Sequence, residues 1–185
     1  MINWHLQVGD PTFIGWLVTI LYCLAGVLAV KVVFNSAKIF SIVTRQKQQQ
    51  FWFLIILLTI FLGVNKQLDL QNLLIAIGRY YAHRDGWFVY RRIIQFSCVV
   101  ALLFGVGLIL IWFVMNMRII VKNNILAILG GCCLLIFIVI RVASFYHVIY
   151  TINISFMGVN VVLVLELLGA LLIGVNARIL LLKMF

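Results

Sequence analysis

Long apolar runs, separated by short segments that carry lysine and arginine, restrict the fold of this chain more than any other feature. A helix needs about 20 mainly apolar residues to cross the hydrocarbon core of a bilayer. Five runs predict such helices, at residues 13–30, 51–64, 93–115, 124–143 and 158–175. The second run reaches the required length only if residues 49–50 and 65–68 join it, with Lys66 extending its amine to the membrane surface. Four spans are therefore the alternative.

The composition leads to the same fold class. Hydrophobic residues make up 66% of the chain and charged residues 10%, whereas soluble domains have about 45–50% and about 25%. We therefore expect an all-α integral membrane protein, with residues 1–185 forming a single transmembrane helical domain. The net charge of +10 does not indicate nucleic-acid binding, because the cations lie at the ends of apolar runs, where they anchor and orient helices.

The cations also predict the orientation in the membrane. Residues 31–47 hold the densest block of cations without a counter-charge, which is typical of a cytoplasmic loop. The N-terminus is then outside and the C-terminus cytoplasmic. The cytoplasmic side receives eight cations and the outer side five: Lys31, Lys38, Arg45, Lys47, Arg118, Lys122, Arg178 and Lys183 against Lys66, Arg79, Arg84, Arg91 and Arg92.

Residues 65–95 hold most of the polar chemistry of the chain. Within them, the apolar residues of segment 70–81 recur at the spacing of one helix face, with Asp69, Gln71 and Arg79 on the polar side. This pattern predicts an amphipathic helix on the outer membrane surface. The apolar residues at 39–40 and 42–43 similarly predict an interfacial helix in part of the loop 35–50.

Arg141 and Glu166 lie within or near apolar runs, where an ionisable group costs about 2.5–3.5 kcal/mol and needs a partner or a wet cavity. The predicted topology puts Arg141 near the outer end of its span and Glu166 roughly 12 Å below the outer surface. We expect the two side chains to pair, either as a fixed structural contact or as part of a working site. Ser144 and His147 follow Arg141 on the same helix face.

The polar residues therefore gather on the outer side and predict a cation-rich site for an anionic group, such as a lipid phosphate or a carboxylate. The candidate residues are Lys66, Asp69, Gln71, Arg79, Arg91, Arg92, Arg141, Ser144, His147 and Glu166. No catalytic residue is identified. The motifs of nucleotide, haem and metal sites are missing, and the four cysteines lack zinc-ligand spacing, so we expect no cofactor and no metal.

Several of these positions carry a resemblance. The segment Asn65–Gln71, Gly86-Trp87 with Arg91-Arg92, then Arg141, Ser144-Phe145 and His147, and finally Glu166 with Gly169, resemble an uncharacterised bacterial family of small multi-pass membrane proteins. The resemblance spans about residues 51–169 and implies a bacterial plasma membrane. Tyr146 and Ile149 depart from the more polar residues of that family, which weakens the idea of a metal site or a proton relay.

Three functional hypotheses follow. The first is an accessory or assembly-forming subunit that binds other membrane chains or itself, which the small size and the glycines within the spans favour. The second is a small transporter or channel for an anionic solute, gated at Arg141 and Glu166. The third is an enzyme that acts on a lipid head group, with His147 or Asp69 as base and arginines as anion clamp.

Overall fold

The computed structural model describes residues 11–68, 120–144, 155–156 and 159–184, together with nine isolated positions between 77 and 108. Four helices of these segments are long and apolar enough to cross a membrane. They are α1 (Phe13–Phe34), α3 (Ile42–Leu68), α6 (Val121–Ser144) and α7 (Val161–Leu182). A helix of four residues, α2 (Ser36–Ile39), joins α1 to α3. Two short strands, β1 (Ser155–Phe156) and β2 (Val159–Asn160), pair antiparallel before α7.

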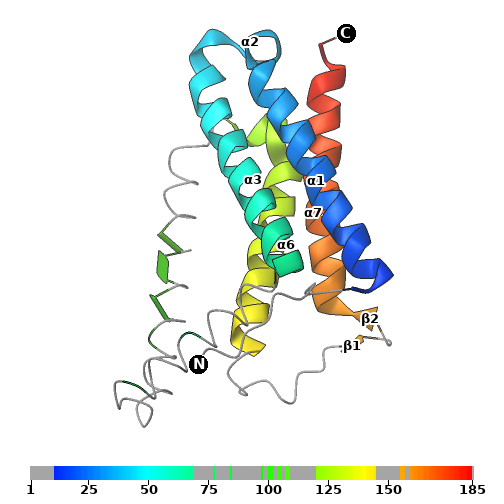
Figure 1. The fold of residues 1–185 in the computed structure, drawn as a ribbon. Coiled ribbons are helices and arrows are strands. Elements are labelled where there is room, and N and C mark those ends of the chain that lie inside the picture. The colour runs from blue at the N-terminus through cyan, green and yellow to red at the C-terminus, as the bar shows by residue number, and fades with distance from the viewer. Residues whose placement is uncertain are drawn as a thin grey trace.

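The four long helices form a bundle in which α1 and α7 run in one direction and α3 and α6 in the other (Figure 1). One end of this bundle carries α2 and the C-terminal end of α7, and we call it the α2 end. The opposite end carries the last turns of α3 and α6 and the paired strands, and we call it the hairpin end. The main packing joins α6 to α7, α1 to α3 and α1 to α7.

These helices confirm four of the five predicted spans. The predicted span 93–115 lies outside the described residues apart from scattered positions, as does the predicted surface helix 70–81 apart from Ile77. The second span is longer than its apolar run, since α3 has 27 residues and includes the polar segment 44–50. The segment 35–50 forms α2 and the first turns of α3, with Phe40 buried between them, and its interfacial position stays a prediction.

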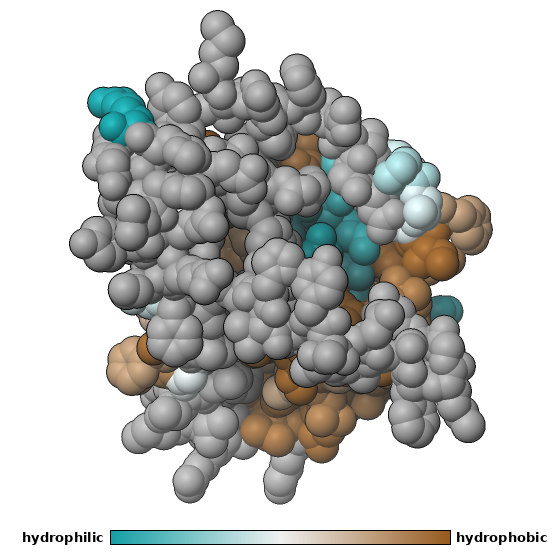
Figure 2. Space-filling view, turned by 90° about the horizontal axis from the view of Figure 1, so that it is seen from below, coloured by the Kyte–Doolittle hydropathy of each residue, from teal (hydrophilic) through white to brown (hydrophobic). Residues whose placement is uncertain are grey.

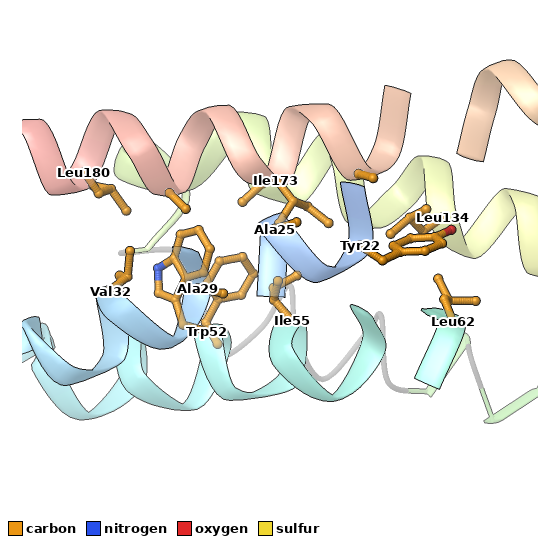
Figure 3. Packing of buried hydrophobic residues seen from close by; sticks show 14 of the residues in the cluster. Tyr22, Ala25, Ala29, Val32, Trp52, Ile55, Leu62, Leu134, Ile173 and Leu180 are labelled. Carbon is orange, nitrogen blue, oxygen red and sulfur yellow. The ribbon is translucent and has the colours of Figure 1, made fainter. Parts of the chain in front are cut away.

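Apolar side chains fill the space between α1, α3 and α7 (Figure 3). Trp52 of α3, Ala29 of α1 and Leu180 of α7 belong to this core, and all of them are almost fully buried. Alanine in α1 leaves room for larger side chains of the core, so large and small residues interdigitate as a close-packed interior requires. The opposite faces of the same helices expose leucine, isoleucine and phenylalanine, as expected of helices in lipid.

Gly130 of α6 and Gly169 of α7 bring these two helices into close contact. A methyl group added at Gly130 would lie 2.7 Å from the Gly169 carbonyl oxygen, and one added at Gly169 would lie 2.6 Å from Leu134. Such contacts are shorter than side chains tolerate, so glycine is needed on both sides. The close approach therefore occurs at Gly130. Gly131 is in ordinary contact instead, since its added methyl would meet Ile55 at 3.9 Å.

We predict that Gly130→Ala lowers the free energy of unfolding by about 1–3 kcal/mol, because the methyl group forces α6 away from the backbone of α7. Gly131→Ala, one residue along the same helix, is the matched control and leaves stability unchanged or slightly raised. Thermal unfolding of the full chain in detergent micelles measures both. Equal melting temperatures for the two variants would contradict the close packing.

Candidate functional site

A buried ion pair and a tyrosine hydroxyl connect three helices towards the hairpin end. Lys66 Nζ of α3 donates to Glu166 Oε2 of α7 at 3.1 Å. Tyr22 Oη of α1 donates to the other carboxylate oxygen, Oε1, at 3.3 Å. Each carboxylate oxygen therefore has its own donor, and each donor comes from a different helix.

The three groups are almost completely enclosed. The exposed fraction is 8% for Lys66, 3% for Glu166 and 1% for Tyr22. A charge in this position is tolerated only when an opposite charge and hydrogen bonds replace its hydration. Glu166 is therefore held in one position by α1 and α3, and the site fixes the relative register of three spans.

Polar groups beside this site extend it towards the membrane surface. Gln67, the residue after Lys66, donates through Nε2 to Thr19 Oγ1 at 2.7 Å, which gives α1 and α3 a second contact one turn from Tyr22. Arg141 of α6 lies over the ring of Phe137, with 5.8 Å between its guanidinium carbon and the ring centroid. Its charge also acts electrostatically on the Tyr22 hydroxyl. Each of the four spans thus contributes an ionisable group to this half of the bundle.

Seen from the hairpin end, hydrophilic residues lie near the middle of the face, with apolar residues beside them (Figure 2). Within the described residues, no three His, Cys, Asp or Glu side chains come close enough to hold a metal ion. The chemistry available there is that of a carboxylate with an ammonium group and a phenol bound to it, and a guanidinium group nearby. Such a set holds a charge in place or offers a cation to an anionic group.

The structure brings together only part of the predicted site. Lys66 and Glu166 are in direct contact, and Arg141 lies in the same half of the bundle. Ser144 is the last residue of α6. The other candidates lie outside the described residues, so their place in a site stays a prediction: Asp69, Gln71, Arg79, Arg91, Arg92 and His147.

Two expectations about individual side chains change. Lys66 does not extend its amine to the membrane surface, because it is buried and bonded to Glu166. The ion pair that the structure shows for Glu166 is formed with this lysine, whereas the sequence pointed to Arg141. The reason is the helix packing, since α3 and α7 both pack against α1 and bring the two side chains within 3.1 Å of each other.

A second set of buried polar groups lies towards the α2 end. Asn124 Nδ2 of α6 donates to Gln48 Oε1 of α3 at 2.7 Å and to the Ile120 carbonyl at 3.0 Å. Asn176 Nδ2 of α7 donates to Asn124 Oδ1 at 3.4 Å. Asn124 itself has non-helical backbone angles (φ −127°, ψ 23°), so α6 bends there and its side chain replaces helical hydrogen bonds.

Sequence reasoning missed Tyr22, Gln48 and Asn176. Tyr22 is an amphipathic residue inside an apolar run and Asn176 directly follows one, which is the signal that was available, whereas Gln48 lies in a polar segment and stands out from nothing around it. The signal does not name a partner, because Tyr22 and Glu166 are 144 residues apart in the sequence. Only the packing of α1 against α7 brings them together.

No family model, no curated protein and no solved structure matches this chain in the three comparisons. The resemblance to a bacterial family of membrane proteins therefore stays a prediction, and functional conclusions depend on the geometry.

We predict that Lys66→Met lowers the free energy of unfolding by about 3–5 kcal/mol, because it leaves the Glu166 carboxylate buried without its ion-pair partner. Glu166→Gln is also destabilising. The double variant loses less than the sum of the two single losses, because neither charge is then stranded. Tyr22→Phe removes one hydrogen bond and costs about 1 kcal/mol. Strictly additive effects in micelle unfolding experiments would show that the pair contributes nothing as a pair.

We predict that Asn124→Leu lowers the free energy of unfolding by about 1–3 kcal/mol, since it leaves the buried Gln48 amide without its partner. Asn123→Ala is the matched control. Its side chain is exposed, and the backbone carbonyl that accepts from Asn176 at 3.5 Å is retained. The same thermal unfolding measurement compares the two, and a larger loss for Asn123→Ala would contradict the assignment.

Proposed function

We propose that this chain is a small multi-pass membrane protein that acts as an accessory or assembly-forming subunit. The observation that carries the proposal is the enclosed contact among Lys66, Glu166 and Tyr22. The Glu166 carboxylate is enclosed by three helices, and each of its oxygens accepts a hydrogen bond. This arrangement suits a structural contact better than a catalytic or transport site, where the carboxylate would have to meet a substrate.

The outer surface of the bundle supports the same proposal. Along α3 and α7, apolar side chains point away from the core over several successive turns, for example Leu57, Ile60 and Phe61 in α3 and Leu168, Leu171 and Val175 in α7. Lipid chains or the helices of another protein cover such faces equally well, because both are apolar. The apolar outer faces of α3 and α7 are therefore available for contact with other membrane chains.

The proposal includes a location and an orientation. The chain lies in a bacterial plasma membrane with its N-terminus outside and its C-terminus cytoplasmic, and with a fifth span and a surface helix in residues 69–119. The hairpin end then faces outward. Arg141 and Lys66 place two cations beside one acid in that half of the bundle, which supports a site for an anionic group of a lipid or a solute.

A transporter for anionic solutes and a lipid head-group enzyme come second. Both would use Glu166 or Arg141 on a passing molecule. Glu166 would then have to break its ion pair with Lys66 and its hydrogen bond with Tyr22 in every cycle, inside a low-dielectric interior where these contacts are strongest. A scaffold needs no such step.

Native mass spectrometry of the full chain, extracted from membranes in a mild detergent, tests the proposal. We expect masses of several copies, or of this chain with other membrane proteins, in addition to the single chain of 21.1 kDa. Lys66→Met reduces these assemblies together with stability, whereas the exposed control Lys183→Gln leaves them unchanged. Single chains alone in every detergent and in lipid nanodiscs would overturn the proposal.

A further inference from the structure

Exposed cations surround the α2 end of the bundle. Six described lysines and arginines lie on the helix ends there with exposed side chains: Lys31, Lys38, Arg45, Lys47, Arg178 and Lys183. Glu166, the acid that the described residues include, is buried towards the hairpin end and neutralised by Lys66. The α2 end therefore carries a concentration of positive charge from residues of four different helices, α1, α2, α3 and α7.

The length of α3 places some of these cations at the level of lipid head groups. Its 27 residues correspond to about 40 Å at a rise of about 1.5 Å per residue. The hydrocarbon core is about 30 Å thick, and about 40–45 Å with both head-group layers. Because the length of α3 matches the thickness that includes both head-group layers, its first two turns, with Ile42, Val43, Arg45 and Lys47, lie within the head-group layer on the α2 side.

The connection between α1 and α3, which contains α2, is held by a hydrogen bond and a buried side chain, and it also exposes apolar residues. Gln49 Nε2 donates to Ser36 Oγ at 2.7 Å and Phe40 is buried, so α2 is tied to the bundle. In contrast, Ile42 and Val43 are 94% and 87% exposed and lie between the cations at 38 and 45. Apolar side chains that alternate with cations beside a membrane match the boundary between head groups and acyl chains.

We propose that the α2 end binds the head groups of anionic phospholipids, with Lys38, Arg45 and Lys47 contacting phosphates and Ile42 and Val43 entering the acyl boundary. Charge complementarity selects an anionic over a zwitterionic lipid. The exposed side chains of Ile42 and Val43 favour a lipid over a free anion, because they can contact acyl chains and a soluble anion has none. This surface is separate from the polar site at the hairpin end and does not depend on the function proposed above.

Titration of the purified full chain with phosphatidylglycerol and with phosphatidylcholine, followed by native mass spectrometry, tests this proposal. We expect tighter retention of phosphatidylglycerol, which weakens as salt is added. A cation near an anionic surface contributes about fivefold to binding, so the triple variant Lys38→Gln, Arg45→Gln, Lys47→Gln should lower the affinity for phosphatidylglycerol by about 100-fold. Inorganic phosphate at matched ionic strength should not displace the lipid.

Two controls separate charge from folding. The charge-preserving variant Lys38→Arg, Arg45→Lys, Lys47→Arg should bind phosphatidylglycerol as the unchanged protein does. Ile42→Ser with Val43→Ser retains the cations and should weaken binding of the lipid by about tenfold, which an ion-exchange surface would not show. Equal retention of both lipids, or equal binding by the triple glutamine variant with an unchanged melting temperature, would overturn the proposal. Displacement by inorganic phosphate alone would overturn it as well.

Discussion

An ionised carboxylate inside a membrane protein cannot remain without partners, and the arrangement of this bundle depends on how Glu166 meets that requirement. Lys66 and Tyr22 occupy its two oxygens from two other helices. Because the cost of a buried charge is large, slipping any one of α1, α3 or α7 along its axis would break a contact that lipid cannot replace. The Glu166 side chain therefore fixes the axial positions of three helices relative to one another. Their apolar outer faces do not favour any one axial position.

The remaining contacts are of a different kind. Towards the α2 end, neutral amides connect α3, α6 and α7 through Gln48, Asn124 and Asn176, at the bend of α6. Between the two polar sets, Gly130 and Gly169 let α6 and α7 approach until backbone meets backbone. Lipid is as apolar as leucine, so close packing and hydrogen bonds hold helices together in a membrane. This bundle has both.

The two ends of the bundle treat charge in opposite ways. Towards the hairpin end, Lys66 and Glu166 are turned inward and neutralise each other, whereas at the α2 end six described lysines and arginines are exposed near helix termini. The first arrangement holds three helices in position, and the second is the surface for which we propose anionic lipids as ligands.

The sequence by itself determined the helical fold class and four of the predicted spans, because the length of an apolar run is a local property. It also marked Glu166 as a residue in need of a partner. The tertiary structure alone decided that the partners are Lys66 and Tyr22, since a charge within an apolar run carries no information about which distant helix packs beside it. The tertiary structure also decided the length of α3. Gln48 and Gln49 have the composition of a loop, but they belong to α3, where Gln48 accepts a hydrogen bond from Asn124 and Gln49 donates one to Ser36.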